Sequence, residues 1–85
     1  MRLTKPVRQQ LLAQNEGFET RTTFRARNFD ETRHYTIRDG LLHVRATGKG
    51  AWADSRYDQE FIADEATTHK FLRDNLARLD STGLK

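Results

Sequence analysis

Cysteine is absent from this 85-residue sequence, and long hydrophobic runs are absent as well. Without cysteine the chain forms no disulfide bond, and it offers no thiolate nucleophile and no cysteine ligand for zinc. Its longest apolar runs, such as Leu41-Leu42 and Leu11-Leu12-Ala13, are far too short to cross a bilayer. The first residues, Met1-Arg2-Leu3-Thr4, do not open a secretory signal peptide. We therefore expect a cytoplasmic protein that binds no membrane.

Size and composition predict one small domain spanning residues 1–85. No internal repeat or linker-like stretch divides the chain, and 35% of its residues are hydrophobic while 32% are charged. A domain of this size buries about 60 to 65% of the surface of its unfolded chain. That leaves no interior for a sizeable cofactor and little room for a deep substrate cleft, so we expect no cofactor.

Basic residues are concentrated in the first 49 positions. That stretch holds ten basic and five acidic residues, whereas residues 50–85 hold five basic and seven acidic ones, for a net charge of +3. Eleven of the fifteen basic residues are arginine, whose guanidinium presents a planar fork to phosphates and base edges. The arginine bias is consistent with a polyanionic partner, although a GC-rich coding bias would produce it as well.

A helix is expected at each end of the chain. Thr4 can cap a helix over about residues 4–15, and Gly17 can supply the left-handed residue after its end. Asp64 is a good N-cap for a second helix over about residues 64–79, in which apolar residues recur at helical spacing. The apolar stripes of the two helices are Val7, Leu11 and Leu12, and Phe71, Leu72, Leu76 and Leu79.

Between the helices the hydrophobic period changes to two, which indicates β-strands. The pair Asp39-Gly40 predicts a two-residue type I′ turn, which sets Arg38 opposite Leu41 and Tyr35 opposite Val44. The strands are expected over about residues 18–27, 33–38, 41–47 and 56–62, with a flexible loop over residues 48–54. The predicted fold is therefore α+β, a three- or four-stranded antiparallel meander sheet with both helices packed on its apolar face.

The first hairpin is expected to close through residues 28–31, with Phe24 opposite Tyr35 and Ala26 opposite Arg33. In this register the polar face of the sheet gathers arginines and histidines, and Glu19 is its sole acidic residue from the first three strands. The rows across that face are Arg25–His34–Arg45, Thr23–Thr36–His43 and Arg21–Arg38–Leu41, with Arg27 at the rim. Like charges directly opposite each other destabilise a sheet, so such rows favour a compensating partner.

This arginine-rich face predicts a small non-enzymatic nucleic-acid-binding module. Arginines neutralise phosphates and can fork onto guanine, and threonine hydroxyls add further contacts. Sheets and β-ribbons are an established means of entering a groove of the duplex. The principal contacts are predicted to be Arg21, Arg25, Arg38 and Arg45, with Arg27, His43 and Lys49 peripheral. The sequence does not distinguish DNA from RNA.

Two other interpretations of the same face stay open. An acidic protein surface, or a second copy of the chain paired at a strand edge, would satisfy the same arginines. The chain would then be a protein-binding or inhibitory module. Alternatively, Asp58 and Glu60 of the fourth strand pair with Arg45 and His43 and form an ordinary solvated ion network.

Catalytic and metal-binding signals are weak. His34 and His43 lie diagonally on the polar face and could form an acid/base couple of ribonuclease type with Glu19 or Tyr35. The sheet places no third ligand beside the two histidines, and nearby arginines would repel a cation, so no metal site is expected. The prediction is a protein that is not an enzyme, with a His-dependent ribonuclease as a minor alternative.

Overall fold

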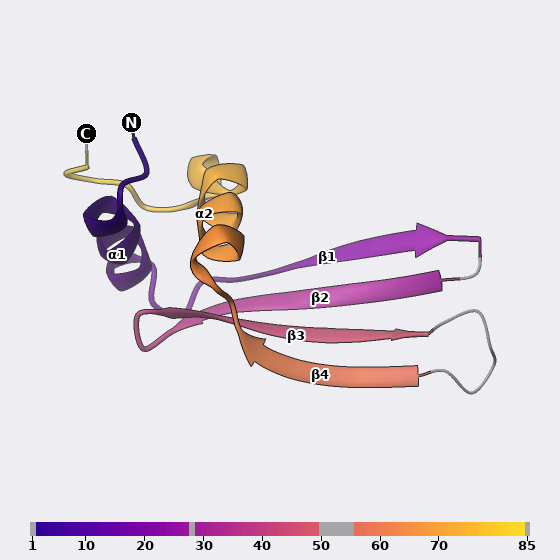
Figure 1. The fold of residues 1–85 in the computed structure, drawn as a ribbon. Helices are drawn as coiled ribbons and strands as arrows, with labels where there is room; N and C mark the ends of the chain where they lie inside the picture. Colours follow the sequence, from indigo (N-terminus) through magenta and orange to yellow (C-terminus); the bar gives the residue numbers. More distant parts are fainter. Residues whose placement is uncertain (1, 28, 50–55, 85) are drawn as a thin grey trace.

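The fold is known from a computed structural model that describes residues 2–27, 29–49 and 56–84. Its four strands form one antiparallel sheet in the order β1-β2-β3-β4, which confirms the α+β meander. In chain order the elements are α1 (Lys5–Gln14), β1 (Glu19–Ala26), β2 (Phe29–Arg38), β3 (Leu41–Lys49), β4 (Arg56–Ile62), α2 (Glu65–Asp74) and the 3₁₀ turn η1 (Leu76–Arg78). Figure 1 shows both helices over one end of the sheet, with the strands extending well beyond them.

The helices begin where their caps predict. The Thr4 hydroxyl accepts a hydrogen bond from the Val7 N–H at 3.4 Å, and the Asp64 carboxylate accepts one from the Thr67 N–H at 2.8 Å. The second helix ends earlier than expected. The side-chain amide of Asn75 donates a hydrogen bond to the Phe71 carbonyl at 2.9 Å, and the chain continues as η1. No helix in the described ranges is long and apolar enough to span a membrane.

The hydrophobic core lies between the helices and the end of the sheet that they cover. Leu11, Ile37 and Leu72 have no exposed surface, and each such burial contributes roughly 1.5 to 3 kcal/mol. The Tyr35 ring stacks on Phe71 with ring centroids 4.9 Å apart, which joins the sheet to α2. The buried cluster is Leu11, Leu12, Ile37, Leu42, Val44, Phe71, Leu72 and Leu79. It confirms that both helices pack on the apolar face.

The β2–β3 register is as predicted. Asp39 and Gly40 have φ angles of 57° and 71°, as a type I′ turn requires, and Arg38 pairs with Leu41. β3 is longer than expected and contains Gly48 and Lys49, which were predicted to lie in a loop. The rest of that predicted loop lies outside the described residues.

The predicted β1–β2 register is wrong by four residues. β2 begins at Phe29, which pairs with Ala26, so the hairpin closes earlier than the expected loop over residues 28–31. Thr20 consequently takes the place opposite Tyr35, and Phe24 lies opposite Glu31. A shift of four is even, so each side chain keeps its face and changes its neighbours. Phe24 is therefore 60% exposed beyond the helices and is not part of the core.

Beyond the helices the inner face of the sheet carries a polar contact. The Tyr57 hydroxyl donates a hydrogen bond to the Glu31 carboxylate, which also pairs with Arg33. The bond from Tyr57, and secondarily that from Arg33, lowers the pKa of Glu31, and Glu31 raises the pKa of Tyr57.

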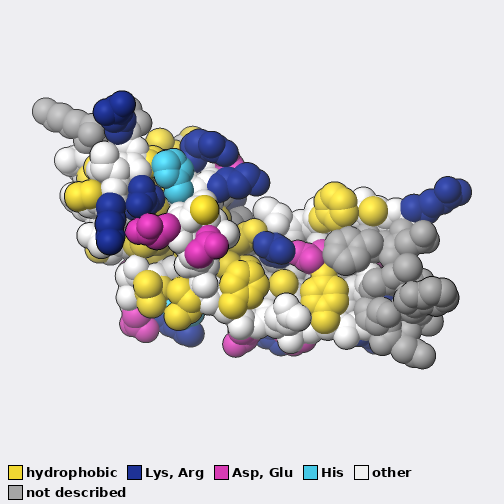
Figure 2. Space-filling view, viewed as in Figure 1, with side chains coloured by type: hydrophobic (Ala, Val, Ile, Leu, Met, Phe, Trp, Pro, Cys, Tyr) yellow, Lys and Arg dark blue, Asp and Glu magenta, His cyan; other side chains and the backbone are white. Residues whose placement is uncertain are grey.

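Hydrophobic side chains also lie over the same strands in Figure 2, and Phe61 is 41% exposed. The two helices thus cover one end of the inner face and leave the other open.

Gly48 makes this contact possible, because a Cβ there would lie 2.5 Å from the Tyr57 hydroxyl oxygen and 2.6 Å from the Asp30 carbonyl oxygen. We expect Gly48→Ala to lower the free energy of unfolding by about 1 to 3 kcal/mol, since one neighbour is backbone and cannot rotate away. Urea denaturation measures the change. In a Tyr57→Ala background the loss should be smaller but not zero, because the Asp30 carbonyl remains. An unchanged midpoint in Gly48→Ala would contradict this packing.

Candidate functional site

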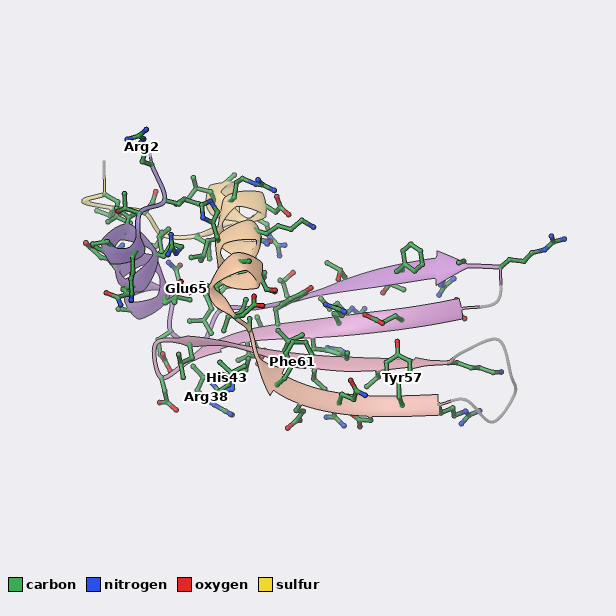
Figure 3. The ribbon with its side chains drawn as sticks, viewed as in Figure 1. Arg2, Arg38, His43, Tyr57, Phe61 and Glu65 are labelled. Atoms are coloured by element: carbon green, nitrogen blue, oxygen red, sulfur yellow. The ribbon has the colours of Figure 1, made fainter. Side chains whose placement is uncertain are left out.

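The candidate site is the side of the sheet that faces away from the helices, called the outer face below. It consists of the odd-numbered residues of β1 and β3 and the even-numbered residues of β2 and β4. Figure 3 shows Arg38 and His43 extending from the sheet on this side. The core residues Ile37, Leu42 and Val44 all belong to the opposite face, so the helices leave the outer face uncovered.

A shallow groove of about 820 Å³ runs across the outer face. Four of the seven predicted nucleic-acid contacts line it, namely Arg21, Arg38, His43 and Arg45. Other outer-face residues that line the groove are Glu19, His34, Thr36, Thr47, Glu60 and Ile62. The alternation of the strands predicts each of them on this face, and Glu19, His34, Thr36 and Glu60 are named there from the sequence.

The central row of the groove is Arg21–His34–Arg45–Glu60. Arg21 occupies the position that the predicted register gave to Arg25, because of the four-residue shift in the first hairpin. Neighbouring strands lie about 4.8 Å apart, so the backbones of Arg21 and Arg45 are about 10 Å apart with His34 between them. The predicted row with Arg25 beside His34 is wrong.

Arg45 is held by acidic residues of β4. Its Nε and Nη2 atoms donate to Asp58 at 3.0 and 2.6 Å, and its Nε lies 3.8 Å from Glu60. The two hydrogen bonds from the guanidinium lower the pKa of Asp58, and Asp58 raises the pKa of Arg45. For Arg45, the ion network described as an alternative above is therefore present.

His43 does not join that network. It lies opposite Ile62, and its Nε2 atom is 3.2 Å from the carbonyl oxygen of Arg38. Glu19 lies in the same row on β1, two strands away. Tyr35 belongs to the inner face, where it stacks on Phe71, so it is not available as a partner for the two histidines. Across the described residues, no group of three His, Asp or Glu side chains could hold a metal ion.

The remaining predicted contacts lie at the far end of the outer face. Arg25, Asp30, Lys49 and Arg56 form one row there, and Arg27 follows β1 in the turn. Asp30 contradicts the expectation that Glu19 is the sole acid contributed by the first three strands. Its position could not be foreseen, because the alternating pattern predicts a second strand that begins only at residue 33.

Several basic side chains of the outer face have no acidic partner among the residues that the structure describes. Within the described ranges, no Asp or Glu oxygen lies within 4.0 Å of the charged nitrogens of Arg21, Arg25 or Arg38. The same holds for Lys49 and Arg56. The outer face is therefore divided into an arginine that Asp58 neutralises and five basic residues that extend into solvent.

No protein-family model, curated protein or solved structure matches this chain.

The pair between Arg45 and Asp58 predicts a specific pH dependence. A carboxylate whose pKa is lowered on folding stabilises the folded state above its ordinary pKa of 3.8, and this stabilisation is lost as the pH falls through the lowered value. In Arg45→Ala we expect the pKa of Asp58, followed by carbon NMR of its carboxyl group, to return toward 3.8. Arg21→Ala is the matched control and should leave it unchanged. Equal titration of Asp58 in all three proteins would refute the pairing.

Proposed function

We propose that this chain is a small, non-enzymatic nucleic-acid-binding module that contacts the phosphate backbone with its outer face. The observation that carries the proposal is the uncovered groove in which Arg21 and Arg38 have no acidic partner among the described residues. An arginine without a partner retains its full set of donors for phosphate or a base edge.

Charge and dimensions of the outer face support the same conclusion. Together with Arg27 in the adjoining turn, it carries seven basic residues (Arg21, Arg25, Arg27, Arg38, Arg45, Lys49 and Arg56) against four acidic ones (Glu19, Asp30, Asp58 and Glu60). From Leu41 to Lys49 the face extends about 27 Å, at roughly 3.3 Å per residue. That length matches about eight base pairs of a duplex, so both ends of the face can reach phosphates.

The structure changes the role of Arg45 among the seven predicted contacts and adds Arg56 to them. Arg45 serves to hold Asp58, so a phosphate would have to compete with a bidentate carboxylate. The principal contacts in this proposal are therefore Arg21, Arg25 and Arg38. Arg27, His43 and Lys49 remain peripheral, and Arg56 joins them.

A protein partner is the second candidate, because the same face exposes apolar side chains. Leu41 is 44% exposed and Ile62 is 54% exposed, and both flank the charged rows. A surface that mixes apolar groups with both signs of charge fits the rim and core of a protein interface better than it fits a phosphate backbone. A partner of this kind would bind with less dependence on salt.

A salt series distinguishes the two candidates. If the outer face neutralises three or four phosphates, affinity for duplex DNA should fall about 40- to 150-fold between roughly 50 and 200 mM salt, and affinity for single-stranded DNA or RNA about 20- to 50-fold. The double variant Arg21→Glu/Arg38→Glu should remove most of the binding, because it reverses both unpaired charges in the groove. Arg2→Glu/Lys70→Glu makes the same change in net charge on the helical side and should retain most of it.

Circular dichroism establishes that both double variants are folded before their binding is compared. Equal loss in the two, or binding that is absent or insensitive to salt, would refute the proposal in favour of a protein partner. The same samples are incubated with RNA, which should remain intact. Cleavage that disappears in His43→Ala would contradict a non-enzymatic role.

A further inference from the structure

Strand β1 forms an open edge of the sheet, and β2 is its single neighbouring strand in the described part of the chain. At its start the Ile37 N–H donates to the Phe18 carbonyl at 3.0 Å. Because bonded and non-bonded pairs alternate in an antiparallel ladder, Thr20, Thr22 and Phe24 then bond to β2. The backbone N–H and C=O groups of the residues between them, Glu19, Arg21, Thr23 and Arg25, point away from the sheet.

We propose that this edge pairs with the same edge of a second copy of the chain, antiparallel and about a two-fold axis at Thr22. The outward-pointing residues would then bond to one another, Glu19 to Arg25 of the second copy and Arg21 to Thr23 of the second copy. Four such pairs give about eight interchain backbone hydrogen bonds.

Charge selects this register over its neighbours. An axis at Arg21 sets that arginine opposite its own copy, and an axis at Thr23 sets Arg21 opposite Arg25 of the second copy. Like charges directly opposite each other destabilise a strand pair, and opposite charges stabilise it. With the axis at Thr22 no like charges are opposed, and two pairs of Glu19 with Arg25 form.

The other edge of the sheet does not offer this complementarity. The Ala63 N–H donates to the Leu42 carbonyl at 2.9 Å, so the same alternation turns the backbone groups of Asp58 and Glu60 outward on β4. Pairing two β4 strands over most of their length sets Asp58 opposite itself, Asp58 opposite Glu60, or Glu60 opposite itself. The self-complementary edge is therefore β1, and a β1 pair closes at two copies.

The two-fold axis runs perpendicular to the sheet, so both outer faces lie on the same side of one eight-stranded sheet. A single strand pair buries less accessible surface than a stable interface, which typically buries at least about 1,200 Å². We therefore expect a reversible dimer whose population changes with protein concentration in the micromolar range.

Sedimentation of the full chain without nucleic acid tests the pairing, so its outcome is independent of the proposed function. Arg25→Glu places a carboxylate opposite Glu19 of the second copy and should weaken the dimer at least about tenfold. Glu19→Arg should do the same, and the double variant Glu19→Arg/Arg25→Glu should restore it. Arg56→Glu is the matched control, since it reverses an arginine of the same row at the opposite edge, and it should leave the dimer unchanged.

An introduced cysteine tests the register, because the chain has none of its own. In the proposed dimer Thr22 faces itself as a non-bonded pair, with Cα atoms about 4.5 Å apart, within reach of a disulfide. Thr22→Cys should therefore give a covalent dimer on mild oxidation, and Ala26→Cys should not. A monomer at every concentration, a dimer that Arg25→Glu leaves intact, or crosslinking at Thr23→Cys in place of Thr22→Cys would each overturn the proposal.

Discussion

The turn at Asp39-Gly40 determines which side chains of the sheet meet the helices and which meet solvent. Both turn residues adopt positive φ, so the two strands that flank them pair without offset. Ile37 and Leu42 consequently lie side by side under the helices, and Arg38 and His43 lie on the outer face. A slip of one residue would exchange these sets and expose the core, so the groove and the core depend on the same two residues.

Sequence alternation determines the face of each strand residue but not its neighbour. The β2–β3 register could be predicted because a glycine-containing turn marks it. The β1–β2 hairpin has no comparable signal, since the sequence between Ala26 and Phe29 contains no Asn-Gly, Asp-Gly or Gly-Gly pair. An even shift also leaves the pattern of apolar residues intact. The faces were therefore predicted correctly, whereas the neighbours of Arg25 and Phe24 and the place of Asp30 were not.

The charges of the outer face follow from the order of the strands. β4 carries its acids at the positions opposite Arg45 and Thr47, so Asp58 and Glu60 neutralise Arg45 before any partner approaches. β1 lies at the other edge, where β2 places His34 beside Arg21 and no carboxylate of a described residue within ion-pair distance. The sheet is thus acidic along β4 and basic along β1, and this gradient is invisible in a net charge of +3.

The same gradient determines how two copies can meet. Along β4 the outward residues are adjacent acids, which repel their own copy in every register that uses most of the strand. Along β1, Glu19 lies six residues before Arg25, and this spacing lets one strand present each charge to the other in a two-fold pair. Pairing there would take up the charge of Arg25 and leave Arg21 and Arg38 of each copy as the unpaired cations of the groove. Assembly at the edge would then remove Arg25 from the principal phosphate contacts and leave that role to Arg21 and Arg38.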